Sequence, residues 1–216
     1  MIAPESFLAE LDADNRVALD RLGVAAAAEP GGGVTVARLL FVALKNEIEA
    51  TECAAGWIAT TPEIDVKLAL ARQTGDEAKH YRLIEKRIAD LGLDPGSFDP
   101  GPRSPMLGYL ASLSTTVERV AAGQFTREAI AVVRNDEFIR FCESRGDAET
   151  AALYRDVIQP DERHHHELGR RLLLRLAVGD EAQERARAAA QRTLALAEEL
   201  QEIARMKAGV SRAPGC

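Results

Sequence analysis

Two short stretches of the sequence repeat the same pairing of an acidic residue with a histidine. The stretch DEAKH contains Glu77-x-x-His80, and the stretch DERHH contains Glu162-x-x-His165. Residues three positions apart lie on one face of an α-helix, so each stretch can direct a carboxylate and an imidazole at one point. A metal ion that is held by both oxygen and nitrogen ligands needs this combination.

A single Glu-x-x-His pair is weak evidence for a metal site, because most acidic residues face water. Two copies on corresponding helices are stronger evidence, since helices that face each other in a bundle can direct both pairs at one centre. Each partner helix should then supply one further carboxylate at matching depth. Four carboxylates would carry four negative charges, which balance two divalent ions.

Helical periodicity dominates the chain, and no alternating pattern indicates a strand. The breakers EPGGG, TTPE, RGD and VGD separate the candidate helices. The stretch TTVE has the form of a capping box and places one helix start at Thr115. The sequence predicts helices over about 5–27, 35–59, 62–91, 115–144, 148–177 and 178–206.

The segment 92–114 is predicted to be a long crossover between two helical hairpins. Its first part is too rich in glycine and proline for regular helix, whereas SPMLGYLASLS near its end could be helical. The hairpins, 35–91 and 116–177, have similar lengths and motifs and look like a duplicated antiparallel pair. This organisation predicts an all-α fold, a four-helix bundle with one long crossover plus extra N- and C-terminal helices.

The helix before the first motif offers Glu47, Glu49 and Glu52 as the further carboxylate. Glu47 has apolar neighbours on its own face, whereas Glu49 and Glu52 share a face with polar and charged residues. An acid inside an apolar stripe is costly unless it is paired or bound to a metal. We therefore choose Glu47 and expect the other two to face solvent.

The helix before the second motif offers Glu128, which lies among Phe125, Val132 and two alanines on an apolar face. Glu118 is too close to the start of this helix and Glu137 too close to its end. We choose Glu128, with a position one turn away as the alternative. The chosen carboxylates precede the two motifs by 30 and 34 residues, which suits residues that face each other across antiparallel helices.

Among the three adjacent histidines, only His165 follows Glu162 by three positions. We therefore expect His164 and His166 at the surface or around the ligands, although Asp161 and His164 form a competing pair with the same spacing.

Other residues could support the ligands. Asp76 and Asp161 each precede the glutamate of a motif, and such a carboxylate can accept the free N–H of a metal-bound imidazole from another helix. The alternative is that both face solvent. Tyr81, next to His80, is either a packing residue with its hydroxyl in water or a redox-active neighbour. Pro160 lies inside the helix of the second motif and is predicted to kink it, which would widen a pocket for a substrate.

The composition indicates an ordinary folded protein, with 216 residues of which 46% are hydrophobic and 28% charged. We expect one helical domain over 1–206, with its core bundle at 35–177, and a disordered tail over 207–216. No apolar run is long enough for a membrane span, and the acidic N-terminus does not resemble a secretory signal, so we expect a cytoplasmic protein.

The three cysteines are scattered and predict neither a disulfide framework nor a four-cysteine metal module. We expect Cys53 and Cys142 to be buried thiols and Cys216 to lie in the disordered tail.

The set of acidic residues and histidines resembles the metal-binding pattern of the ferritin-like di-iron carboxylate proteins, in which Glu and then Glu-x-x-His occur twice. The resemblance covers about 35–177 and implies a ferritin-like bundle that holds two iron ions, or manganese in their place. The paired D-E-x-x-H form is more similar to the oxygenases of this group than to storage ferritins. The ligands that the resemblance implies are Glu47, Glu77, His80, Glu128, Glu162 and His165.

The stretch NDEFIRFCESRGDAETAALYRDVIQPDERHH is also similar to a bacterial tRNA hydroxylase family that acts on an isopentenyl-type modified adenosine. It departs from that family where Glu137-Phe138 lacks an adjacent arginine and where Gln159-Pro160-Asp161 precedes the motif. A net charge of -7 does not favour tRNA as a partner.

These resemblances imply a non-haem di-iron monooxygenase or hydroxylase that uses O2, an organic substrate and an external electron donor. The alternative is a ferroxidase or a peroxide-scavenging protein of rubrerythrin-like or manganese-catalase-like type. A helical scaffold without metal would have to bury six ionisable groups at high cost. The extra helices or the crossover could form a homodimer contact.

Overall fold

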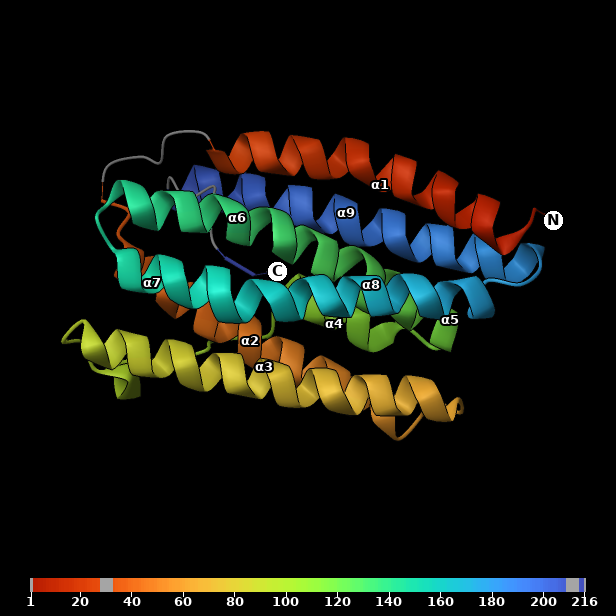
Figure 1. The fold of residues 1–216 in the computed structure, drawn as a ribbon, viewed down its shortest axis with the longest axis horizontal. Helices are drawn as coiled ribbons and strands as arrows, with labels where there is room; N and C mark the ends of the chain where they lie inside the picture. Colours follow the sequence, from red (N-terminus) through yellow and green to blue (C-terminus); the bar gives the residue numbers. More distant parts are fainter. Residues whose placement is uncertain (1, 28–32, 209–213, 216) are drawn as a thin grey trace.

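The computed structural model describes residues 2–27, 33–208 and 214–215. Every regular element in these residues is helical, and they contain no strand. The long helices run side by side along the long axis of the molecule (Figure 1). They are α1 (Pro4–Ala27), α2 (Val36–Ile58), α3 (Ile64–Asp90), α6 (Glu128–Ser144), α8 (Gln159–Leu176) and α9 (Asp180–Ala208), and the short elements are η1 (Pro95–Ser97), α4 (Pro105–Ser112), α5 (Thr116–Arg119), η2 (Val120–Arg127), α7 (Ala148–Leu153) and η3 (Tyr154–Ile158).

Helices α2 and α3 form the first hairpin, as predicted. The hydroxyl of Thr35 caps α2 by accepting a hydrogen bond from the backbone N–H of Arg38 at 3.2 Å. At the other end of α2, the Thr61 hydroxyl donates to the carbonyl of Trp57 at 2.9 Å, and α3 begins two residues after Pro62. Both helices are regular α-helices along their whole length.

The second hairpin pairs α5, η2 and α6 with α7, η3 and α8. The predicted capping box is present, because Glu118 N–H donates to the Thr115 hydroxyl and Glu118 accepts from Thr115 N–H. From Val120 the chain winds as a π-helix for eight residues, and the N–H of Glu128 donates to the carbonyl of Gly123. No sequence pattern predicted this π-helical segment, which ends directly before Glu128.

A second π-helical turn, η3, lies just before Pro160. The N–H of Gln159 donates to the carbonyl of Tyr154, five residues earlier. We expected Pro160 to disturb the helix before Glu162, because proline has no N–H to donate. The structure accommodates it with a π-turn, which is a known way for a helix to absorb an interrupted hydrogen-bond ladder.

The crossover is attached to α2 and contains the short helix α4, so its SPMLGYLASLS stretch is helical in part. The ammonium group of Lys45 donates to the carbonyls of Pro100 and Pro102 at 2.7 and 2.5 Å. Glu49 accepts hydrogen bonds from the backbone N–H and the hydroxyl of Ser104. Our expectation that Glu49 faces solvent is therefore wrong, since this half-buried carboxylate anchors the start of α4.

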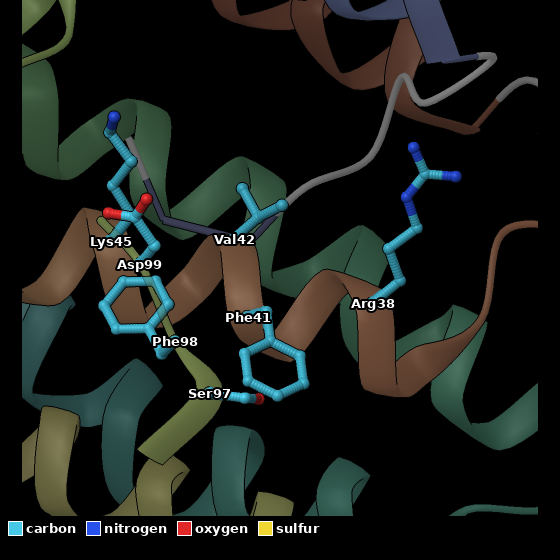
Figure 2. Close-up of a pocket in the computed structure, with 7 residues that line it drawn as sticks. All are labelled: Arg38, Phe41, Val42, Lys45, Ser97, Phe98 and Asp99. Atoms are coloured by element: carbon cyan, nitrogen blue, oxygen red, sulfur yellow. The ribbon is translucent and has the colours of Figure 1, made fainter. Parts of the chain in front are cut away.

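Beside this attachment lies an open groove of about 480 Å³ between α2 and the crossover (Figure 2). The rings of Phe41 and Phe98 stack along it with centroids 6.5 Å apart. None of the six predicted ligands lines the groove.

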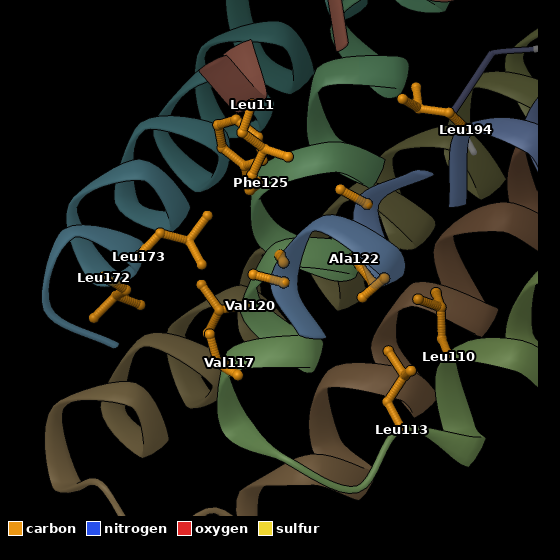
Figure 3. Packing of buried hydrophobic residues seen from close by; sticks show 14 of the residues in the cluster. Leu11, Leu110, Leu113, Val117, Val120, Ala122, Phe125, Leu172, Leu173 and Leu194 are labelled. Carbon is orange, nitrogen blue, oxygen red and sulfur yellow. The ribbon is translucent and has the colours of Figure 1, made fainter. Parts of the chain in front are cut away.

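Helices α1 and α9 cover the second hairpin (Figure 1). The charged face of α9 is solvated and forms i,i+4 pairs such as Arg185 with Glu181. Its other face is apolar and packs Ala190 and Leu194 into the largest apolar cluster, together with Phe125 and Leu173 (Figure 3). None of the described helices is long and apolar enough to cross a membrane.

The end of the chain differs in part from the predicted disordered tail over 207–216. Helix α9 extends to Ala208, beyond the predicted end at residue 206. Pro214 and Gly215 are buried, and their carbonyl and N–H groups bond to Asn46 at 2.6 Å and Asn135 at 3.0 Å. Residues 209–213 and 216, including Cys216, lie outside the described residues.

Candidate metal centre

The predicted ligands lie between two apolar clusters of the interior. Along α2, for example, Leu40 and Leu44 belong to one cluster and Cys53 and Trp57 to the other, with Glu47 between them. Each of the six residues is at most 3% exposed. The set comprises Glu47 from α2, Glu77 and His80 from α3, Glu128 from α6, and Glu162 and His165 from α8.

The six residues form two overlapping groups. In each group, the candidate ligand atoms all lie within 4.8 Å of one another. Glu77 and Glu162 belong to both groups, so two ions could share these carboxylates. The first group is Glu47, Glu77, His80 and Glu162, and the second group is Glu77, Glu128, Glu162 and His165.

The distances within the first group suit ligands of a common ion. Nδ1 of His80 lies 3.4 Å from Glu47, 3.5 Å from Glu77 and 3.7 Å from Glu162. Two atoms that are each about 2.1 Å from one ion lie about 3.0 to 3.6 Å apart at ordinary coordination angles. Direct hydrogen bonds to nitrogen would be shorter, at about 2.7 to 3.2 Å.

The same arrangement recurs in the second group. Nδ1 of His165 lies 3.8 Å from Glu77 and 3.7 Å from Glu162. Nδ1 of both histidines and Oε2 of Glu162 are buried and have no hydrogen-bond partner among the described residues. Buried polar atoms normally have partners. Unpartnered donor atoms that converge on two points therefore fit a pair of metal ions.

The outer nitrogens of the two histidines are held by aspartates from the opposite hairpin. Nε2 of His80 lies 3.1 Å from Asp161, and Nε2 of His165 lies 3.0 Å from Asp76. With a proton on Nε2 that the aspartate accepts, Nδ1 keeps its lone pair for a metal ion. The structure thus places both aspartates as the sequence predicted, and Asp161 contacts His80 rather than the competing His164.

The charges of the cluster are costly without a metal. Burial raises the pKa of Glu47 to about 7 and that of Glu162 to about 8. Burial and the charge of Glu162 also raise the pKa of Glu128 well above its ordinary value. Buried carboxylates that face one another keep protons for this reason, and divalent ions would replace those protons.

The first histidine shows the opposite balance. Burial alone would lower the pKa of His80, but the surrounding carboxylates, above all Glu47 and Glu77, raise it to about 12. Burial would raise the pKa of Glu77, but its contact with His80 and the charge of Arg127 lower it to about 2. The carboxylates therefore create a strongly negative electrostatic potential at the centre of the cluster.

Two polar side chains next to Glu128 were not predicted. Nε2 of Gln73 donates to Oε1 of Glu128 at 2.6 Å, and Nη1 of Arg127 lies 3.1 Å from the same oxygen. Gln73 also lies 3.3 Å from Glu77. Sequence signals for both existed, since Gln73 precedes Glu77 by one helical turn and Arg127 is adjacent to Glu128.

The tyrosine that belongs to this region is Tyr154 rather than Tyr81. Tyr81 is half-buried and packs against the apolar cluster at that end of the interior, with the guanidinium of Arg82 over its ring. Tyr154 is fully buried, and its hydroxyl has no partner among the described residues. Burial, followed by the charge of Glu47, raises the pKa of Tyr154 well above its ordinary value.

The neighbouring histidines are not members of either group. Nδ1 of His166 lies 2.6 Å from the carbonyl of Phe125, and its ring stacks on that residue, so His166 attaches α8 to η2. His164 is half-buried.

The two cysteines that the structure describes lie outside the two groups as well. Cys53 and Cys142 are buried free thiols, as predicted, and burial raises the pKa of each to about 12.

Comparisons of the chain with protein-family models, with curated proteins and with solved structures found no match. Function must therefore be inferred from the chemistry of the buried residues. The two groups could hold metal ions, because they combine carboxylate oxygens with imidazole nitrogens in a closed, apolar interior.

Proposed function

We propose that this protein is a ferritin-like di-iron carboxylate protein and that it is an O2-dependent monooxygenase or hydroxylase. The observation that carries the proposal is the pair of groups that share Glu77 and Glu162, each with one inward Nδ1 that has no hydrogen-bond partner. The support for a ferritin-like bundle is the arrangement of two helical hairpins, joined by one long crossover, that together supply all six residues.

The charge balance favours two divalent ions. Four glutamates supply four negative charges, and the two neutral imidazoles add one nitrogen to each ion. Carboxylate-rich sites with imidazole suit iron or manganese. Each ion would have four protein residues around it, which leaves room for O2 or a substrate in a coordination shell of about six.

The bound iron would supply the activation of O2. The overall reaction inserts one oxygen atom into a C–H bond and consumes O2, two electrons and two protons to give the alcohol and one water molecule. Asp76 and Asp161 orient the imidazoles and fix their tautomers, and the apolar clusters on both sides keep bulk water away. The electrons must come from an external donor, since the chain has no four-cysteine metal module.

One observation favours a second candidate, a ferroxidase or a peroxide-scavenging protein of rubrerythrin-like or manganese-catalase-like type. The pocket that Arg127 and Cys53 line beside the centre has a volume of only about 10 Å³. Such a space holds about one water molecule. A very small substrate, such as Fe²⁺ or peroxide, would need no larger opening.

The test is metal analysis of protein purified without chelators, followed by optical spectroscopy when O2 is added to the reduced form. Two irons per chain and a transient absorption after O2 support the proposal. Glu52→Ala, on the exposed side of α2, is the control that should leave the metal content unchanged. A protein that binds no iron or manganese would overturn the proposal, and rapid turnover of peroxide alone would select the second candidate.

A further inference from the structure

The two groups have matching ligands but different neighbours at corresponding positions of the two hairpins. Glu77 and Glu162 correspond, and the residues one turn before them are Gln73 and Ile158. Glu47 and Glu128 each belong to one group only, and we call them the terminal carboxylates. Gln73 donates a hydrogen bond to Glu128, whereas Ile158 is apolar and fully buried in the cluster near the first group.

A second difference lies next to the terminal carboxylates themselves. Asn46 precedes Glu47, and its side-chain N–H points to the carbonyl of Pro214 at 2.6 Å. Arg127 precedes Glu128 and turns inward, where its side chain is 10% exposed and contacts Oε1 of Glu128 at 3.1 Å. The first group therefore has a neutral amide at this position, and the second group has a buried positive charge.

The two terminal carboxylates are consequently held in different ways. Oε1 of Glu128 is engaged by both Gln73 and Arg127. The side chain of Glu47 faces Nδ1 of His80 at 3.4 Å and also lies next to Glu77, and no amide or guanidinium of the described residues donates to it. An ion that enters the first group meets a carboxylate without competing donors. An ion that enters the second group must share Glu128 with a cation.

We propose that the two ion positions are inequivalent, that the first group fills first, and that Arg127 sets the lower affinity of the second group. This inference rests on the proposed two-metal centre. Arg127 already neutralises part of the negative charge that attracts the second ion, and it repels that ion directly. A unit charge several ångströms from an ion in a buried site changes the affinity by about 10-fold or more.

Gln73 is a positioning residue with the opposite effect. It fixes Oε1 of Glu128 by a short hydrogen bond and leaves Oε2 for the ion. A residue that orients a ligand in this way raises metal affinity, and its loss costs about 10-fold to 100-fold. The ligands of the second group are therefore well ordered but bind their ion weakly. The ion of the second group should accordingly exchange with solution more readily than the ion of the first.

The test is a calorimetric titration of the metal-stripped protein with Mn²⁺, accompanied by electron paramagnetic resonance of the bound ion. We expect two binding steps at least about 10-fold apart. A single-ion spectrum should dominate at one equivalent, and magnetic coupling between two ions should appear only after the second. Arg127→Gln should strengthen the second step more than the first and bring the steps together, and Gln73→Leu should weaken the second step more than the first.

Arg119→Gln is the matched control. Arg119 lies on the same continuous helix and is as buried as Arg127, at 8% exposed, but it contacts Leu113 and Thr61 rather than the cluster. Arg127→Lys keeps the charge and should retain the gap between the steps. Equal affinities in the wild type, or an equal shift of both steps in Arg127→Gln, would overturn the inference. Absence of any Mn²⁺ binding would instead remove the two-metal centre itself.

Discussion

The two hairpins carry the same candidate ligand motif in different surroundings. In the first hairpin, α2 and α3 are regular α-helices, and Glu47 lies among apolar neighbours. In the second, a π-helical segment precedes each ligand-bearing helix, directly before Glu128 and four residues before Glu162. The spacing of the ligands therefore fixes a symmetric donor set, and the helix geometry around it makes the two halves chemically different.

The largest expected effect is on the number of metal ions bound per chain, which should differ between variants of the shared and of the terminal carboxylates. Glu162→Ala removes a ligand from both groups, so we expect both ions to be lost after desalting. Glu47→Ala and Glu128→Ala each remove a ligand from one group only and should leave one ion per chain. The measurement is the metal content per chain. A Glu162→Ala protein that keeps two ions would contradict the shared position of this carboxylate.

The next effect concerns the stability of the metal-stripped protein as a function of pH. The pKa values of Glu47, Glu162 and His80 rise on folding from 4.5, 4.5 and 6.5 to about 7, 8 and 12. Each group binds its proton more tightly in the folded protein, so its stabilising contribution is complete below the lower value and is lost as pH rises through the higher one.

The free energy of unfolding of the stripped protein should therefore fall between about pH 4.5 and 8, by several kcal/mol as an order of magnitude. Chemical denaturation at a series of pH values measures it. Glu47→Gln removes the contribution of Glu47 and should make the fall between about pH 4.5 and 7 shallower. A stability that rises with pH over this range would show that the cluster is not protonated.

A smaller effect tests the pairs in which the histidine of one hairpin contacts the aspartate of the other. Asp161→Asn acts through His80 and should weaken binding to the first group, whereas Asp76→Asn acts through His165 and should weaken binding to the second. Each change should cost about 10-fold to 100-fold in metal affinity. Titration with Mn²⁺ resolves the two steps. If both variants weakened the same step, the crossed assignment would be wrong.

The smallest effect compares two glycines. A Cβ on Gly169 of α8 would lie 2.7 Å from the backbone of Gln124 and Phe125 in η2, so Gly169→Ala should destabilise the protein by about 1 to 3 kcal/mol. A Cβ on Gly75 of α3 would meet no atom within 4 Å, so Gly75→Ala should stabilise it by about 0.4 to 1 kcal/mol. Thermal unfolding measures both, and effects of the same sign would refute the close approach of η2 and α8.

The positions of the six candidate ligands were predictable because helical spacing and apolar neighbours are local properties. Glu47 could be distinguished from Glu49 and Glu52 by the face of the helix on which it lies. Asp76 and Asp161 could be identified because each precedes the glutamate of a motif. The role of Glu49 was not, because its partner Ser104 is far away in the sequence and reaches it only through the crossover.

A disturbed helix before Glu162 was predictable from Pro160, but the π-helical segment η2 was not. The backbone of α8 approaches η2 closely at Gly169, and such a tertiary contact is not visible in residue preferences. Arg127 illustrates the same limit, because a charged residue next to a ligand turns outward in most helices, and only the fold turns this one inward. The local sequence pattern was thus sufficient to predict the candidate ligands, whereas the residues around them are determined by long-range contacts.

The exchange of aspartates between the hairpins has a consequence for how this protein could change in evolution. Because Asp161 supports the histidine of one half and Asp76 that of the other, neither half is self-sufficient. An insertion or deletion that shifted one hairpin along the other would misalign both histidines at once. The two hairpins are held in register by this mutual dependence, and substitutions that preserve it are confined to side chains that do not take part in the exchange.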